Sequence, residues 1–330
     1  MRRRPLLRLS GVALASAMWP GVGAAQPSAK VPVVGRLHPG AASDAILQTL
    51  LQAFRTAMRD LGQVEGRSYR LDVRFAESDM AALPSLAAAM VRDGAATIVT
   101  SGTHALRAAK AVTPAVPIVM SMSGPDPVGE GLVSSFARPG GNVTGLAGQI
   151  DEVQAKQLEL LREVLPALTD VLVLMNPDGV RTWPAIRTAA AALGLRMHET
   201  DVRRPQDLDG AFAATTPNGQ WAVLSIADPG LIDQLRARIA LLALRYRLAS
   251  AHSYYASADA GILLSYAIDL IDVNRRAAMF VDKILKGAAP AEIPIERPNK
   301  FQLTINLGTA RALGIVVPQS ILQRADEVIE

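Results

Sequence analysis

The sequence predicts an α/β protein of two Rossmann-like halves, each built on a parallel sheet with helices on both faces. Three observations predict this fold. Apolar segments of strand length alternate with amphipathic helical segments over residues 30–121. The same alternation resumes after residue 150 and continues to residue 252. Between the halves lies segment 121–146, which is rich in glycine and proline and has no regular period over its whole length.

The first half shows strand and helix patterns in strict alternation. Segment 45–61 carries apolar residues at helical spacing, among them Leu50, Phe54 and Met58, and Gly62 follows where a helix C-terminus favours glycine. A βαβαβαβ order implies parallel strands, because right-handed crossovers place each helix on a face of the sheet. We expect strands at 30–37, 69–75, 96–100 and 117–121, and helices at 45–61, 83–92 and 103–111.

The second half repeats this pattern at similar length. Gly194 ends the helical pattern of one segment and Gly287 ends that of another, as expected for helix C-termini. The repetition predicts a second parallel sheet. We expect strands at 171–175, 195–199, 221–226, 249–252 and 261–265, and helices at 151–164, 183–193, 205–214, 231–248 and 268–285.

Residues 1–25 have the three parts of an export signal. Arginines occupy positions 2–4, residues 6–19 are mostly apolar but too few to span a bilayer, and 23–25 are small residues suited to cleavage. We expect a mature protein in the periplasm, without a lipid anchor because no cysteine follows the apolar run. The Arg-Arg-x-Leu-Leu order also fits a twin-arginine signal, so the Sec and twin-arginine routes both stay open.

Composition argues against several classes of protein. The formal net charge of +4 could suggest a nucleic-acid binder, but four arginines lie within the first eight residues. Without them 30 basic and 30 acidic residues remain, so no nucleic-acid partner is expected. The absence of cysteine excludes disulfides and thiolate metal sites. Half of the residues are hydrophobic, which is enough for two substantial cores.

Motifs for catalysis and cofactor binding are missing. The sequence has no G-x-G-x-x-G after a strand, no P-loop, no G-x-S-x-G elbow and no H-E-x-x-H pair. Its histidines, His38, His104, His198 and His252, are scattered. His38 and His104 could share a cleft, but no third ligand for a metal can be named. We therefore expect neither a metal nor a cofactor.

Ligands of parallel sheets bind beyond the carboxyl ends of the strands, so the residues that follow each strand are the candidates. Ser101, Gly102, Thr103 and His104 come where a strand ends and a helix begins. The N–H groups of that helix start, with the two hydroxyls, could hold a carboxylate. The alternative is that Ser101 or Thr103 is only an N-cap, and both roles can coexist. His38 follows the first strand at the same edge.

Polar and aromatic residues follow the other strands. Asp126 and Asp228 each precede a proline after a strand and could bond the ammonium group of an amino acid, or could instead fix a turn. Asn176 has the same two interpretations. Tyr254 and Tyr255 could stack on an apolar or aromatic ligand, the alternative being packing under a loop.

Asn142, Thr144 and Gly145 end the central segment. They match a glycosylation sequon, which means little without a eukaryotic context. We interpret them as a polar turn that fixes the passage between the two halves.

Several stretches resemble a known family. GPDPV and GLVSSFARPGGNVTG in the centre, and KFQLTINLGTARALGIVVPQSILQRADEVIE at 300–330, are the specific ones. LGQVEGRSYRLDVRFAE at 61–77, LPSLAAAMV at 83–91 and LVLMNP at 172–177 extend the likeness over nearly the whole chain. In these stretches the chain resembles TrpX-like periplasmic binding proteins, substrate-binding components of ABC transporters.

The resemblance implies a type I periplasmic binding fold in which three strands join two lobes as a hinge. It implies a first lobe of 30–145 plus about 267–287 and a second of 146–266 plus about 288–330, with Tyr266 at the second crossover. It also implies a monomer that binds a small molecule and docks transiently on the membrane permease. Relatives bind aromatic amino acids, so an amino acid is the first expectation.

The sequence also departs from the commoner family pattern. His38-Pro39 and His104 stand where small hydroxyl residues or glycine are frequent, and Ala227 stands where serine is common. Two other functions stay open. One is an exported α/β enzyme acting on a small carboxylic acid, with Ser101, His104 and Asp126 as its candidates. The other is a sensor partner with the same fold and ligand site.

Overall fold

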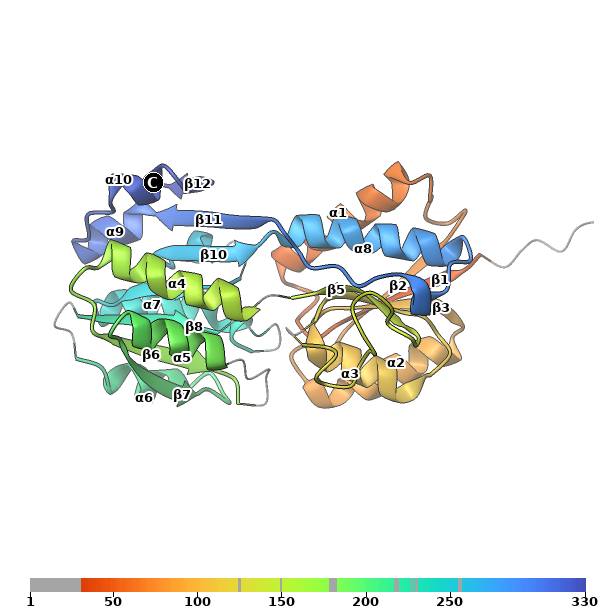
Figure 1. Ribbon diagram of the computed structural model, residues 1–330, viewed down its shortest axis with the longest axis horizontal. Coiled ribbons are helices and arrows are strands. Elements are labelled where there is room, and N and C mark those ends of the chain that lie inside the picture. Colours follow the sequence, from red (N-terminus) through yellow and green to blue (C-terminus); the bar gives the residue numbers. More distant parts are fainter. Residues whose placement is uncertain are drawn as a thin grey trace, which may run out of the picture. The chain divides into compact units, whose positions relative to one another are not determined.

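The computed structural model describes residues 31–123, 126–148, 150–177, 183–216, 220–226, 228, 231–254 and 257–330. Two sheets, each covered by helices, define two α/β lobes in this part of the chain (Figure 1). The expected export signal at 1–25 lies outside the described residues, as does Tyr255. Within the described ranges, no helix has the length and apolar character needed to cross a membrane.

The first lobe is built on a five-stranded, wholly parallel sheet. Its spatial order is β2-β1-β3-β4-β5, so the carboxyl ends of β1, β3 and β4 lie next to one another. The strands are β1 (Val33–His38), β2 (Arg70–Phe75), β3 (Ala95–Thr100), β4 (Ile118–Ser123) and β5 (Val143–Ala147).

Helices cover both faces of the first sheet. On one face α2 (Leu83–Arg92) packs beside α3 (Gly102–Val112), preceded by the short turn η1 (Met80–Ala82). On the other, α1 (Ala45–Asp60) packs beside α8 (Leu270–Leu285), as Figure 1 shows. A helix from late in the chain therefore completes the core of the first lobe.

The second lobe has a seven-stranded sheet of order β12-β11-β10-β9-β8-β6-β7. Its neighbours pair in parallel except β10 and β11, which run antiparallel. The strands are β6 (Asp170–Met175), β7 (Arg196–Asp201), β8 (Trp221–Ser225), β9 (Ala249–His252), β10 (Leu264–Ile268), β11 (Phe301–Asn306) and β12 (Glu327–Ile329).

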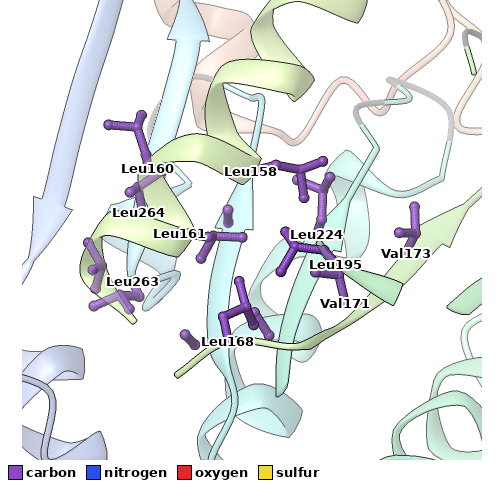
Figure 2. Packing of buried hydrophobic residues seen from close by; sticks show 14 of the residues in the cluster. Leu158, Leu160, Leu161, Leu168, Val171, Val173, Leu195, Leu224, Leu263 and Leu264 are labelled. Atoms are coloured by element: carbon purple, nitrogen blue, oxygen red, sulfur yellow. The ribbon is translucent and has the colours of Figure 1, made fainter. Parts of the chain in front are cut away.

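Leucines and valines from both layers form the main core of this lobe. Leu158 and Leu161 of one helix meet Val171, Val173 and Leu224 of the sheet (Figure 2). A second cluster, around Phe212, fills the opposite side. The helices are α4 (Ile150–Val164), α5 (Trp183–Ala192), α6 (Asp207–Ala213), α7 (Arg236–Arg245), α9 (Leu307–Leu313) and α10 (Gln319–Leu322), with short turns η2 (Asp233–Leu235), η3 (Ala258–Ala260) and η4 (Pro290–Glu292).

The chain passes between the two sheets three times: from β5 to α4, from β10 to α8, and from η4 to β11. These passages are hydrogen-bonded to one another. The N–H of Glu296 donates to the carbonyl of Gly145 at 2.9 Å, and the N–H of Ala147 donates back to Glu296 at 3.0 Å. The N–H of Asp269 donates to the carbonyl of Lys300 at 3.0 Å. The connection is thus a small bonded assembly.

Two expectations from the sequence were wrong in this region. Residues 143–147 form strand β5 of the first sheet, whereas the sequence indicated only a polar turn. A strand this short beside a glycine- and proline-rich loop gives no periodic signal. The strand expected at 261–265 lies at 264–268. Gly261 instead ends η3 in the left-handed region, at φ +96°, which delays the strand by three residues.

Candidate ligand cavity

A cavity of about 890 Å³ of unfilled space, part of it open to solvent, is lined by both lobes. Its polar residues come mainly from strand ends, and leucines and isoleucine supply apolar surface between them. The described lining consists of His38, Pro39, Leu47, Leu50, Ser101, Gly102, Thr103, His104, Ser121, Met122, Ser123, Ile226, Asp228, Asp233, Ser253, Tyr254, Leu270 and Asn274.

The first-lobe wall of the cavity is built where β1, β3 and β4 end. The N–H of Ser101 donates to the carbonyl of Leu37 at 3.2 Å, which ties the end of β3 to β1. Ser101 has the backbone of an N-cap, but its side chain makes no capping hydrogen bond to α3. Its hydroxyl is therefore not committed to the helix, and the first turn of α3 faces the cavity with an N-terminal dipole that favours an anion.

His38 contributes a neutral imidazole to the same wall. Burial, and secondarily the charge of Arg36, lower its pKa to about 3. Its Nδ1 accepts the N–H of Gly40 at 2.9 Å. Because Nδ1 is the acceptor, the ring proton lies on Nε2, and His38 offers a single N–H donor.

Two buried carboxylates form the second-lobe wall. Asp228 Oδ1 accepts the Leu231 N–H at 2.8 Å and the Asn176 side-chain amide at 3.2 Å. Asp233 Oδ1 accepts the N–H of Asp228 at 3.0 Å. Burial and the neighbouring Asp233 raise the pKa of Asp228. This wall is therefore acidic, and a cation brought to it would relieve the repulsion between the two acids.

Asp233 is also the end of a hydrogen-bonded chain. His252 Nε2 lies 3.1 Å from Asp233 Oδ1, and His252 Nδ1 lies 3.1 Å from Ser257 Oγ. Although these residue types make up hydrolase triads, Ser257 is fully buried, donates to the carbonyl of Tyr254 at 2.8 Å and does not line the cavity. A hydroxyl so placed is no nucleophile, and the chain instead holds Asp233 in position.

Tyr254 supplies an aromatic surface beside these acids. Arg236 lies over its ring at 5.7 Å from the centroid, and the same guanidinium reaches Asp44 of the first lobe at 3.3 Å. Burial, Asp233 and Asp44 raise the pKa of Tyr254, so its hydroxyl is protonated throughout the physiological range. Tyr254 thus offers both a ring face and a neutral hydroxyl.

Met122 reaches the cavity through an irregular strand end. Its φ is +103°, a rare conformation for a residue with a side chain, and the pairing of β4 with β5 shifts register between Ser121 and Ser123. Such a bulge re-aims a side chain. Ser253, on the other side, has a buried Oγ that finds no hydrogen-bond partner within the described chain. A polar ligand is the natural partner for such an atom.

The structure brings together most of the residues proposed for the ligand. His38, Ser101, Gly102, Thr103, His104, Asp228 and Tyr254 all line the cavity. Asn176 lies behind Asp228, to which its side-chain amide donates a hydrogen bond. Together with His104 it borders a second, shallower pocket. Asp126 is exposed and accepts the N–H of Gly129 at 2.7 Å, and it is not among the residues described for the lining. The turn interpretation therefore accounts for Asp126.

Of the residues proposed for the hinge, Thr144 and Gly145 lie in β5, Asn142 directly precedes it, and Tyr266 lies in β10. Thr144 Oγ1 donates to the carbonyl of Ile293 at 2.8 Å, and the Asn142 side chain donates to Val116 at 2.8 Å. A Cβ on Gly145 would lie 2.3 Å from the carbonyl oxygen of Met120, so only glycine fits there. Tyr266 stacks on Phe301 with ring centroids 5.7 Å apart.

Several lining residues escaped prediction. Asp233 begins the short turn η2, eight residues after the end of β8 at Ser225, where no strand-end rule would select it. Ser121 lies inside β4 and Ser123 is its last residue. Asn274 left a detectable signal, because it interrupts the apolar face of the α8 pattern between Val273 and Ala277. A polar residue on a buried helix face commonly marks a hydrogen-bonding role.

Two sheets with a shared cavity at their strand ends define a two-lobed ligand-binding protein with the type I periplasmic binding fold. The sequence matches the family of ABC transporter substrate binding proteins over residues 41–329. The chain therefore belongs to this family, whose members bind solutes.

Individual relatives agree with this assignment. A tyrosine-binding protein of Clostridioides difficile (strain R20291) is 25% identical over 265 residues, which cover 79% of this chain and 75% of the relative. A conserved domain protein from Vibrio cholerae shares the fold at a TM-score of 0.81 and 23% identity, covering 91% of this chain and 100% of that chain.

The fold is shared with proteins of different ligands. An ABC domain from Streptococcus pneumonia in complex with L-Trp has a TM-score of 0.81 and 22% identity, covering 90% of this chain and 99% of that chain. A Caulobacter myo-inositol binding protein has a TM-score of 0.59 and 14% identity, covering 92% of this chain and 98% of that chain. Ligand class must therefore be argued from the cavity itself.

Proposed function

We propose that this protein captures an α-amino acid with an apolar or aromatic side chain and delivers it to an ABC importer. One observation carries the proposal. A single cavity contains hydrogen-bond donors and a helix start from the first lobe, two buried acids from the second, and apolar side chains besides. An amino acid has one anionic group, one cationic group and a side chain to match these three surfaces.

In this arrangement the carboxylate binds at the first-lobe wall, near Ser101, the start of α3 and the Nε2–H of His38. The ammonium group binds Asp228 and Asp233, where it offsets the repulsion of the two acids through charge-assisted bonds. The side chain lies against Tyr254 and the neighbouring leucines. The ligands named for the tyrosine-binding relative and the L-Trp-bound structure are of this class.

The transport role follows from ligand contacts on both lobes. A ligand that contacts both walls stabilises the state in which they lie together, and a permease can recognise that state. Residues 142–145 and Tyr266 would form the hinge, the mature monomer would work in the periplasm, and the protein would bind its ligand without converting it.

A thermal-shift screen of residues 26–330 tests the ligand class. The panel holds the twenty amino acids, with the amide and the deaminated acid of each aromatic one. At a hundredfold excess over the dissociation constant a ligand adds about 2.7 kcal/mol to the free energy of unfolding. We expect a hit that needs both charged groups.

The same experiment separates the alternatives. Stabilisation by the deaminated acid as strong as by the amino acid would contradict a role for the two aspartates. A ligand consumed over hours, followed by chromatography of the mixture, would instead support the enzyme. A sensor partner would bind the same ligand but would not restore uptake in cells that lack the importer's binding component.

A further inference from the structure

Arg36 lies directly behind the first-lobe wall of the cavity. It occupies β1 on the same face as His38, and only 4% of its surface is exposed. Its guanidinium lies over the ring of Phe54 at 5.2 Å from the centroid. One end of the guanidinium, Nη2, donates to Oδ1 of Asn274, a residue of α8 that lines the cavity.

This buried cation has no counter-charge in the described part of the chain. Burial, and secondarily the charge of another cation, Arg55, lower the pKa of Arg36 to about 10. Arg36 is nevertheless charged at neutral pH. Its Nη1 is buried and finds no hydrogen-bond partner among the described residues. A buried charge without a partner lowers the stability of the folded state, so stability does not explain why an arginine stands at this position.

Asn274 transmits this charge to the cavity. Its Oδ1 accepts from Arg36 and, at 3.4 Å, from the hydroxyl of Ser121, while its Nδ2 donates to the carbonyl of Leu270 at 2.7 Å. The amide is therefore held with its oxygen toward the cation. An amide nitrogen has two N–H groups, and the hydrogen bond to Leu270 uses one of them. His38, Ser121 and Asn274 all line the cavity next to Arg36's positive field.

We infer that Arg36 is a specificity-determining residue, because its charge makes the first-lobe wall select an anionic group. The bound ligand supplies the counter-charge that Arg36 lacks. The inference rests on the proposed function, since it assigns the carboxylate of the ligand to this wall. Arg36 acts through Asn274 and through its field, without lining the cavity. Charge selection at this wall complements the acidic wall contributed by the second lobe.

The test compares the wild-type mature protein with Arg36→Met, which keeps apolar contact with Phe54 but removes the charge. Arg55→Met is the matched control, because Arg55 is a first-lobe arginine that pairs with Glu65 at 3.0 Å and does not line the cavity. Calorimetric titrations use L-tryptophan and L-tryptophanamide, which differ only at the acid group, a carboxylate in the first and a neutral carboxamide in the second. The melting temperature of each ligand-free protein is also measured.

We expect wild type to prefer the acid over the amide, and Arg36→Met to reduce that preference by about tenfold or more, through weaker binding of the acid. Arg55→Met should leave the preference within about twofold. An unchanged preference in Arg36→Met, or an equal loss of both ligands, would overturn the inference.

The ligand-free arm gives an independent answer. Because Arg36 is an uncompensated charge, Arg36→Met should melt at or above the wild-type temperature. A drop of more than a few degrees would make Arg36 a structural residue and overturn the inference. If wild type binds neither probe, the melting temperatures alone test the inference. That result would count against the amino-acid ligand but not against charge selection at the first-lobe wall.

Discussion

Nη1 of Arg236 lies 3.3 Å from Oδ2 of Asp44, and this ion pair joins the second lobe to the first beside the cavity. Asp44 also caps α1, since its Oδ1 accepts the N–H of Ile46 at 2.9 Å. The two oxygens of this carboxylate thus have separate roles: Oδ1 caps a helix within the first lobe, and Oδ2 forms the ion pair between the lobes. Because they are separate, substitution can distinguish them.

Asp44→Asn should preserve the helix cap but weaken the link between lobes. Asparagine is as good an N-cap as aspartate, so the melting temperature of the ligand-free protein should change little. Loss of the ion pair, worth about 1 kcal/mol at this partial burial, should raise the ligand dissociation rate about fivefold. Stopped-flow release of the strongest amino-acid hit measures it. An unchanged rate would show that the pair does not stabilise the bound state.

Asp228→Asn should weaken binding of the amino acid by about tenfold and leave its deaminated acid unaffected, because the ammonium group loses a charge-assisted bond. The measurement is a pair of calorimetric titrations on one protein preparation. Equal loss for both ligands would indicate a distorted loop, since Asp228 also accepts from Leu231.

The same carboxylate predicts a pH dependence. Burial and Asp233 raise the pKa of Asp228 in the folded protein, so the folded state binds its proton more tightly than the unfolded state does. The contribution of this group to the free energy of unfolding therefore falls as pH rises from the ordinary aspartate range through the raised pKa. Ligand affinity should change the opposite way, increasing as Asp228 ionises. Calorimetry across pH checks it, and Asp228→Asn should flatten both trends.

Gly145→Ala should destabilise the protein by at least about 3 kcal/mol. Its φ is +120°, and a Cβ would lie 2.3 Å from the carbonyl oxygen of Met120 on the neighbouring strand. Gly141→Ala is the matched control, because no atom lies within 4 Å of its added Cβ, and it should cost no more than about 0.5 kcal/mol. Urea unfolding gives both values. Equal effects at the two positions would mean that β5 moves away freely.

Ser253→Ala should raise the free energy of unfolding of the ligand-free protein by about 1 kcal/mol, because its buried Oγ has no partner in the described chain. Ser250→Ala, in the adjoining strand, should instead lower it by about 1 kcal/mol, because Ser250 Oγ accepts the N–H of Leu263 at 3.0 Å. Denaturation of both variants, with and without ligand, checks the contrast. A loss of stability in Ser253→Ala would show that the hydroxyl is already satisfied.

The sequence was sufficient for the elements with a strong apolar period. Helix 83–92 and strand 249–252 were predicted to the residue, and Gly62, Gly194 and Gly287 all have positive φ at helix ends. The rule that ligands bind beyond the carboxyl ends of parallel strands also selected His38, Ser101 and Asp228. The structure places all three in the lining of one cavity, because parallel strands bring their carboxyl ends to one edge of the sheet.

The rest depended on contacts between distant segments. The sequence places Arg36 in the first strand, but only the packing of α1 and α8 shows that it is buried against Phe54 and Asn274. Asp233 is held at the cavity by a hydrogen bond with His252, which lies nineteen residues further along the chain. At Asp126 the local pattern left two interpretations open, because an Asp-Pro after a strand makes the same turn whether or not a ligand is near.

The backbone of Met122 has a consequence for how this sequence can evolve. The positive φ costs about 1–3 kcal/mol that glycine would not carry, whereas the methionine side chain covers part of the cavity wall and packs beside Leu47 and Leu50. A substitution at this position changes the cavity wall and the backbone cost together, so we expect a change of ligand to be accompanied by a change here.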